Sequence, residues 1–133
     1  MPFVLDNSVV SGWFLASEAT AYTDAVATRL QEDRAVVPSV WELELANVLR
    51  AACVSERMTA QAAQQVVTQI TSLPIEVDRH AAGPSELIAL SLRFGLDSYH
   101  AAYLELALRL QLPVATQDAS LRQAALASGV GVV

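Results

Sequence analysis

A short apolar run near the start of the chain ends directly in a carboxylate. Residues 3–5 (Phe-Val-Leu) are followed by Asp6, and then by Asn7 and Ser8, which are typical of turns and helix starts. An apolar run of this kind is typical of a parallel strand covered on both faces. The ends of such strands border the ligand crevice in open α/β sheets. The alternative is that Asp6 only caps the next helix.

Short apolar segments alternate with helical patterns along the rest of the chain. Further strands are predicted at residues 35–37, 75–77, 113–116 and 130–133, and helices at 9–15, 18–32, 40–57, 59–72, 84–93, 98–110 and 119–127. Because helices separate the strands, the strands are expected to be mostly parallel in an α/β sandwich. No repeat or linker interrupts the 133 residues, so residues 1–133 are expected to form a single domain.

Composition restricts the partners of this chain. Hydrophobic residues make up 53% of it, the formal net charge is −6, and all eight basic residues are arginine. An acidic protein gains little from the general field of a polyanion, so a nucleic-acid substrate would be held by local arginines or by metal. Cys53 cannot form an internal disulfide and is expected to be a buried thiol in a reducing compartment. No apolar run reaches membrane-spanning length, so a cytoplasmic protein without membrane contact is expected.

Two polar residues stand out on the apolar helix at residues 40–57. Glu44 and Asn47 are three residues apart and share a face, whereas Glu42 points to a different side. A carboxylate on such a helix is costly to bury unless it is paired or bound to metal. The alternative is that Glu44 and Asn47 mark a solvated stripe.

A second strand-end acid repeats the pattern of Asp6. Asp118 follows an apolar strand and Thr116, and it opens the last helix, which it would also suit as an ordinary cap. Parallel strands end at the same edge of a sheet, so Asp6 and Asp118 are expected on the same side. With Glu44 they would form a carboxylate cluster, which a hard cation such as Mg²⁺ or Mn²⁺ would compensate.

The start of the helix at residues 98–110 contains a histidine. Asp97 is placed to cap this helix and to accept a hydrogen bond from the backbone N–H of His100. His100 lies on the same face as Asp97 and close to Tyr103. A single helical histidine is more often a packed residue than a ligand.

Four blocks of sequence together resemble the PIN-domain proteins, in particular the VapC-type toxins of bacterial toxin–antitoxin pairs. The blocks are residues 3–8, residues 38–49 with Glu-Leu-Ala-Asn at 44–47, residues 99–107, and residues 115–118. The resemblance implies a three-layer α/β/α sandwich with a mostly parallel central sheet of the RNase-H-like type. It also implies a metal-dependent endoribonuclease, and a homodimer neutralised by a small VapB-like antitoxin.

The resemblance also assigns site residues. Asp6, Glu44 and Asp118 match the first, second and fourth acids of the family. His100 stands where the family has its third metal-binding aspartate, and Asp97 lies one turn earlier. Imidazole is a poor ligand for Mg²⁺ and a better one for Mn²⁺, so His100 would bind the metal, or Asp97 would substitute for it, or activity would be lost.

These observations combine into a functional hypothesis. Asp6, Glu44 and Asp118 would hold Mg²⁺ or Mn²⁺ for the hydrolysis of RNA phosphodiesters, with His100 and Asp97 as additional ligands. These carboxylates would be oriented by hydrogen bonds from Ser8, Asn47 and Thr116. Arg50 would contact the RNA backbone, or else form a surface ion pair. The alternative function is a degenerate PIN domain that binds RNA or protein without cutting.

Overall fold

Four parallel strands form the centre of the molecule. The computed structural model describes all residues, 1–133, and its sheet has the order β3-β2-β1-β4. The strands are β1 (Phe3–Leu5), β2 (Ala35–Pro38), β3 (Ile75–Asp78) and β4 (Val114–Ala115). Val4 of β1 lies beside Val36 of β2 on one side and Val114 of β4 on the other. All strand pairs are parallel, as predicted.

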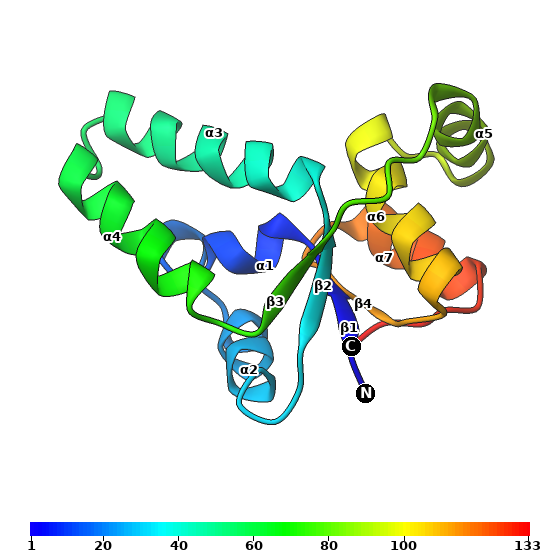
Figure 1. Ribbon diagram of the computed structural model, residues 1–133, viewed down its shortest axis with the longest axis horizontal. Coiled ribbons are helices and arrows are strands. Elements are labelled where there is room, and N and C mark those ends of the chain that lie inside the picture. Colours follow the sequence, from blue (N-terminus) through cyan, green and yellow to red (C-terminus); the bar gives the residue numbers. More distant parts are fainter.

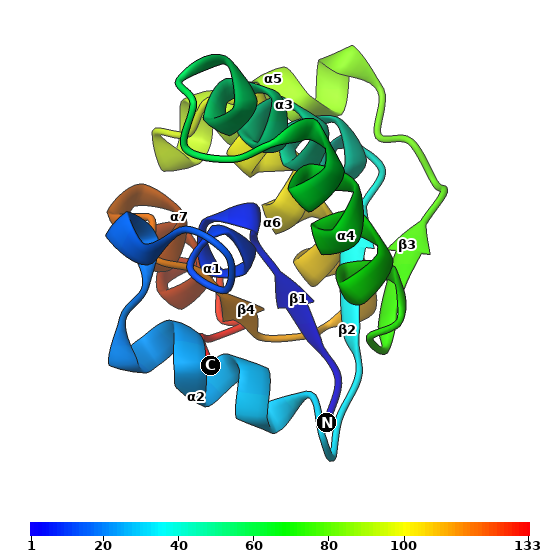
Figure 2. The ribbon, with the colours of Figure 1, turned by 90° about the vertical axis from the view of Figure 1, so that its left-hand side faces the viewer.

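Helices cover both faces of this sheet. They are α1 (Asn7–Ser11), the 3-10 helix η1 (Ala16–Glu18), α2 (Ala21–Arg29), α3 (Val40–Val54), α4 (Ala60–Thr71), α5 (Pro84–Phe94), α6 (Ser98–Leu110) and α7 (Ala119–Ala127). Figures 1 and 2 show α6 and α7 on one face, and α1, α2 and α4 on the other. The predicted three-layer α/β/α sandwich is therefore confirmed.

The central strand β1 explains why the layers pack as they do. Phe3, Val4 and Leu5 are each fully buried, so side chains on both faces of the strand contact helices. On one face lies α6, with Tyr103, Leu104 and other apolar residues that are also fully buried. A continuous apolar run is the sequence that a strand buried on both sides requires.

The N-terminal helices differ from the prediction. Instead of helices at residues 9–15 and 18–32, α1 covers only Asn7–Ser11 and α2 begins at Ala21. Gly12 follows α1, and a Cβ at this position would lie 2.6 Å from the Thr23 side chain. Thr20 and Thr23 form a capping box that fixes the start of α2. The absence of a side chain at Gly12 therefore allows the end of α1 to lie close to α2.

The predicted final strand at residues 130–133 is also wrong. Only Val132 forms a bridge there, with Val114 of β4, and it is parallel. Gly129 and Gly131 have positive φ angles of 87° and 83°, which interrupt an extended conformation.

Other helix ends follow the predicted signals. Thr59 caps α4 by accepting from the N–H of Ala62, and Gly95 ends α5 in the left-handed conformation. By contrast, α3 ends at Val54, three residues before the predicted end at residue 57, and Glu56 adopts a positive φ of 61°.

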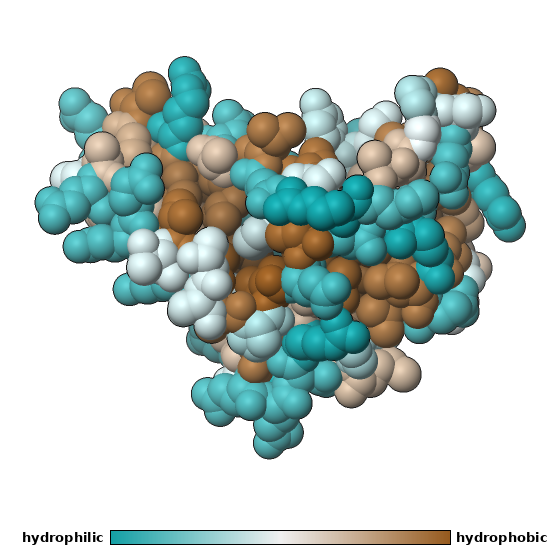
Figure 3. All heavy atoms as spheres, in the orientation of Figure 1, coloured by the Kyte–Doolittle hydropathy of each residue, from teal (hydrophilic) through white to brown (hydrophobic).

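The arm made by α3 and α4 extends away from the sheet, and apolar atoms are visible between its two helices in Figure 3. Cys53 lies in this region and is partly exposed, so the prediction of a buried thiol is wrong. None of the helices combines the length and the apolar character that crossing a membrane would require.

Candidate active site

Asp6 is the buried centre of the carboxyl edge of the sheet. Asp6 is only 2% exposed, and its side chain makes no capping hydrogen bond to α1. The interpretation of Asp6 as a simple cap is therefore wrong. Instead, its Oδ2 accepts hydrogen bonds from the hydroxyls of Ser8 and Thr116, each at 2.6 Å. The side chain is held from two neighbouring strand ends.

The same two hydroxyls connect Asp6 to the end of β4. The Ser8 hydroxyl accepts from the backbone N–H of Gln117 at 2.9 Å, and the Thr116 hydroxyl accepts from the backbone N–H of Asp118 at 3.0 Å. Each hydroxyl therefore donates to Asp6 and accepts from the loop that carries Asp118. This geometry suits the orienting role predicted for Ser8 and Thr116.

Glu44 lies on α3 in a half-buried position. Its Oε1 accepts a hydrogen bond of 2.7 Å from the hydroxyl of Tyr103 on α6. Burial raises the pKa of the Glu44 carboxyl, and the negative charge of Asp6 raises it further, while the Tyr103 hydrogen bond acts in the opposite direction. The effect of Asp6 shows that the two carboxylates lie close enough to repel each other. Glu44 and Asp6 thus form an acid pair.

Tyr103 is a further residue of this candidate site, to which the sequence pattern assigns no role. It is fully buried, and burial together with the charges of Asp6 and Glu44 raises the pKa of its hydroxyl. The group therefore stays protonated and can donate to Glu44. A polar signal was present in the sequence, since a buried tyrosine hydroxyl requires a partner.

Asp118 caps α7, as the alternative interpretation of this residue predicts. Its Oδ2 accepts from the backbone N–H of Leu121 at 2.8 Å, while its Oδ1 accepts no hydrogen bond from the chain. A cap of this kind does not prevent the free oxygen from binding a ligand. Asp118 is joined to Asp6 through Thr116 but forms no direct contact with it.

Asp97 and His100 form a local pair at the start of α6. Asp97 Oδ1 accepts from the backbone N–H of His100 at 2.8 Å, as predicted, and lies 3.2 Å from His100 Nδ1. Asp97 therefore lies next to one nitrogen of the imidazole. His100 is close enough to Glu44 that a positive charge on it would lower the Glu44 pKa.

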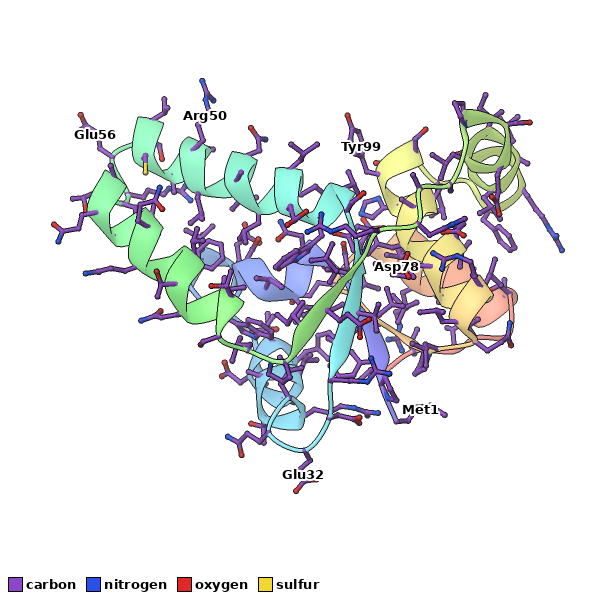
Figure 4. All side chains as sticks on the ribbon, in the orientation of Figure 1. Met1, Glu32, Arg50, Glu56, Asp78 and Tyr99 are labelled. Atoms are coloured by element: carbon purple, nitrogen blue, oxygen red, sulfur yellow. The ribbon has the colours of Figure 1, made fainter.

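A hollow of about 440 Å³ lies in front of Glu44. It is lined by Val40, Leu43, Glu44, Asn47 and Tyr99. Glu44 and Asn47 therefore share a face, as predicted, and this face borders a concave surface. Tyr99 lies at the start of α6 beside the N-terminal half of α3 (Figure 4).

Arg50 does not line this hollow. It is exposed and points away from the rest of the molecule on the outer side of α3 (Figure 4). It forms no ion pair, so the alternative interpretation of a surface ion pair is wrong. The acid expected on the solvent side, Glu42, does form one, with Arg79.

A sequence model of the PIN domain matches residues 3–126, which covers most of the chain and all the acids described above. The protein belongs to the PIN domain family. PIN domains are generally nucleases and typically use divalent metal ions, so the family supports a nuclease-like function for this chain.

A solved structure gives the same fold. The crystal structure of PAE2754 from Pyrobaculum aerophilum matches this PIN domain with a TM-score of 0.71. The match covers 93% of this chain and 84% of that one, at 20% sequence identity. No curated protein matches this chain. The structural likeness therefore supports the fold.

The donor atoms of this PIN domain suit a hard cation, although they do not form a ready-made cage. No group of three or more His, Cys, Asp or Glu side chains is arranged to hold a metal ion. Mg²⁺ is usually held by one or two carboxylates together with water, so the Asp6–Glu44 pair is sufficient. In addition, the Asn7 side-chain oxygen beside Asp6 is buried without a hydrogen-bond partner. These oxygen donors fit Mg²⁺ or Mn²⁺.

Proposed function

We propose that this PIN domain is a divalent-metal-dependent endoribonuclease that hydrolyses RNA phosphodiesters. The observation that carries the proposal is the buried carboxylate of Asp6, which lies beside Glu44 while neither acid is paired with an arginine. Two uncompensated carboxylates at a buried edge repel each other. A bound cation would remove this cost and place a positive charge where a phosphate can approach.

The residues that would hold the ion follow from the site. Asp6 and Glu44 would be the principal ligands, and Asp118 would contribute its free oxygen. When bound, Mg²⁺ or Mn²⁺ supplies an activated water and stabilises charge on the scissile phosphate.

The surrounding residues act on these ligands. Ser8 and Thr116 fix one oxygen of Asp6 and leave Oδ1 without a hydrogen bond from the chain, and Tyr103 holds Glu44. Asn47 lines the same hollow and offers an amide to either Glu44 or the substrate. These contacts reduce the motion of the carboxylates before the substrate arrives.

His100 and Asp97 replace the missing third acid in this proposal. Asp97 faces Nδ1 of the imidazole, which leaves Nε2 for the metal or for a phosphate oxygen. A carboxylate that orients a ligating histidine in this way is a common arrangement around metals. Asp97 would therefore orient His100, with its second oxygen free for the ion.

The RNA backbone would be held by arginines that are not already paired. Arg50 is one of these, and its exposed position on α3 allows it to contact RNA outside the hollow. It would act on overall affinity and not on the reacting phosphate.

The proposed biological role is that of a VapC-type toxin, which acts as a homodimer and is neutralised by a small VapB-like antitoxin. Exposed apolar side chains support contacts with other chains, because contiguous apolar surface marks interaction sites. On α5, which has no buried residue, Ile88 is 55% exposed and Leu92, one turn later, is 81% exposed. Co-purification with a small partner, and the mass of the resulting complex, test this role.

Cleavage of a fluorescent RNA panel tests the enzymatic proposal. The purified protein, free of any antitoxin, is assayed with Mg²⁺, with Mn²⁺ and with chelator. We expect metal-dependent cleavage that Asp6→Asn reduces at least about 100-fold, because the central ligand loses its charge. Glu32→Gln is the matched control, since it removes the charge of one exposed carboxylate far from the site.

The second candidate is a degenerate PIN domain that binds RNA or protein without cutting it. Two observations favour it: His100 occupies the place of the third acid, and no three-ligand group is present. The variant His100→Asp separates the two functions. Cleavage by the natural protein supports the nuclease, whereas cleavage by His100→Asp alone supports the binding module. Binding of RNA without cleavage by either protein would contradict the nuclease proposal.

A further inference from the structure

Tyr99 is the one large aromatic side chain that the molecule exposes. Eight large hydrophobic side chains are exposed, and Tyr99, at 60%, is the only aromatic one among them. Its hydroxyl makes no hydrogen bond with the rest of the chain. Packing within this chain therefore does not explain its position.

The location of Tyr99 links it to the acid site. It lines the hollow of about 440 Å³ that also contains Glu44 and Asn47. Val40 and Leu43 of α3 complete the lining, so apolar and aromatic side chains lie beside a carboxylate and an amide. Ligand pockets commonly combine a mostly apolar wall with a few polar groups, and this volume is within their usual range.

An unpaired nucleobase has the chemistry that this hollow would accept. Bases stack on aromatic side chains through their flat apolar faces and form hydrogen bonds along their edges. Tyr99 offers the face, and Asn47 offers an amide that can both donate and accept. The net charge of −6 gives little attraction for phosphates, so a contact independent of charge would contribute much of the affinity.

We propose that Tyr99 is a stacking platform for an unpaired base next to the phosphodiester that is cleaved. The proposal rests on the proposed ribonuclease function and names a residue that would contact a base of its RNA substrate. A duplex would keep its bases stacked on each other and unavailable to Tyr99. An apolar segment of a partner protein is the competing occupant, and the polar wall of Glu44 and Asn47 favours a base over such a segment.

The test measures binding and cleavage separately. Binding of a labelled single-stranded RNA is followed by fluorescence anisotropy with Ca²⁺ in place of Mg²⁺, and KM and kcat are determined with Mg²⁺. We expect Tyr99→Ala to weaken binding about 5- to 150-fold, the range expected for loss of one stacked base. Tyr99→Phe and Tyr99→Trp should retain binding, and Leu126→Ala is the control for loss of an exposed apolar side chain elsewhere.

A set of RNAs, each with a single abasic nucleotide at a different position, tests for stacking specifically. At one position next to the cleaved bond, removal of the base should weaken binding to the natural protein but cause little further loss for Tyr99→Ala. Equal loss for both proteins at every position would overturn the proposal.

Other outcomes separate the inference from the function on which it rests. Binding of RNA that Tyr99→Ala leaves unchanged would overturn the stacking platform and leave the nuclease intact. No binding or cleavage of any RNA by the natural protein would contradict both. Loss of partner-protein binding without loss of RNA binding would assign the hollow to the protein partner instead.

Discussion

Asp6 has two carboxylate oxygens in different situations. Oδ2 accepts from the hydroxyls of Ser8 and Thr116, while Oδ1 accepts no hydrogen bond from the chain. Oδ2 is thus already held by the chain, whereas Oδ1 can accept from a ligand or from water. At the scale of the residue, the free oxygen of Asp6 is the atom to which the proposed cation would bind.

The raised pKa of Glu44 leads to a prediction about stability. Because the folded protein holds the Glu44 proton more tightly than the unfolded chain, ionisation of this group disfavours the native state. Stability is therefore lost as pH rises from the unfolded pKa through the higher folded pKa. We expect Glu44→Gln, which retains a carbonyl oxygen for Tyr103, to melt at a higher temperature than the natural protein at pH 7 in chelator.

This stabilisation should shrink as the pH falls towards 4, where the natural carboxyl is protonated in both states. Thermal melts across this range measure the difference. Glu32→Gln is the control for loss of one exposed negative charge. A Glu44→Gln protein that is less stable than the natural one at pH 7, or a difference that does not depend on pH, would contradict the interpretation.

At the scale of the element, α6 connects the site to the edge of the sheet. Its first turns carry His100 and Tyr103, which face the acids. In its last turn, Arg109 donates to Glu105 at 2.8 Å and to Asp78 at the end of β3 at 2.9 Å. This guanidinium holds the pKa of Asp78 below its usual range. The same helix is thus anchored at two points.

Removal of Arg109 should destabilise this anchor. Glu105 is only 5% exposed, so Arg109→Met leaves a buried carboxylate without its partner. We expect a loss of about 3 kcal/mol in the free energy of unfolding, measured by urea denaturation. The double variant Arg109→Met with Glu105→Gln should recover part of this loss.

Arg57→Met is the control, because Arg57 is exposed and forms no ion pair. A cost for Arg109→Met no larger than that for the control would show that the Glu105 contact contributes little.

The sequence predicts the bounds of a helix best where residues next to its ends determine them. The bounds of α6 were predicted correctly, since Asp97 caps its first turn and the helix ends before Pro113. The start of α2 was missed although the local capping box of Thr20 and Thr23 marks it. The end of α1 was missed as well, and Gly12 there contacts Thr23 of another helix. Helix propensities summed over a short stretch of sequence carry no information about a contact between two helices.

The candidate site also has parts that the sequence predicts and parts that it does not. Asp6 and Asp118 could be placed at one edge from the sequence, since parallel strands end together. The Tyr103–Glu44 hydrogen bond could not, because its partners are 59 residues apart and the helical period does not say which helix a buried face meets. The hollow in front of Glu44 also depends on how α3 and α6 lie relative to each other.

At the scale of the whole molecule, half of the arginines already form ion pairs with acids of the chain. Arg29, Arg34, Arg79 and Arg109 form ion pairs, which leaves four of the eight arginines unpaired: Arg50, Arg57, Arg93 and Arg122. The protein therefore offers few cations to an RNA backbone. Its affinity for RNA should depend on the ion and on base contacts more than on general charge attraction.

This distribution predicts a weak salt dependence. With at most four arginines neutralising phosphates, a plot of log affinity for single-stranded RNA against log salt should have a slope no steeper than about −3. Binding titrations at several salt concentrations, with the divalent ion constant, measure the slope. A slope of about −5 or steeper would show that groups beyond the unpaired arginines hold the backbone.

The most direct test of the site is equilibrium binding of Mn²⁺, followed by the loss of the electron paramagnetic resonance signal of the free ion. We expect the natural protein to bind Mn²⁺, Thr116→Val to bind it about 10- to 100-fold more weakly, and Asp6→Asn to lose the site. Thr68→Val, on the exposed face of α4, should behave as the natural protein does. No binding by the natural protein, or equal binding by Asp6→Asn, would contradict a metal site at the carboxyl edge of the sheet.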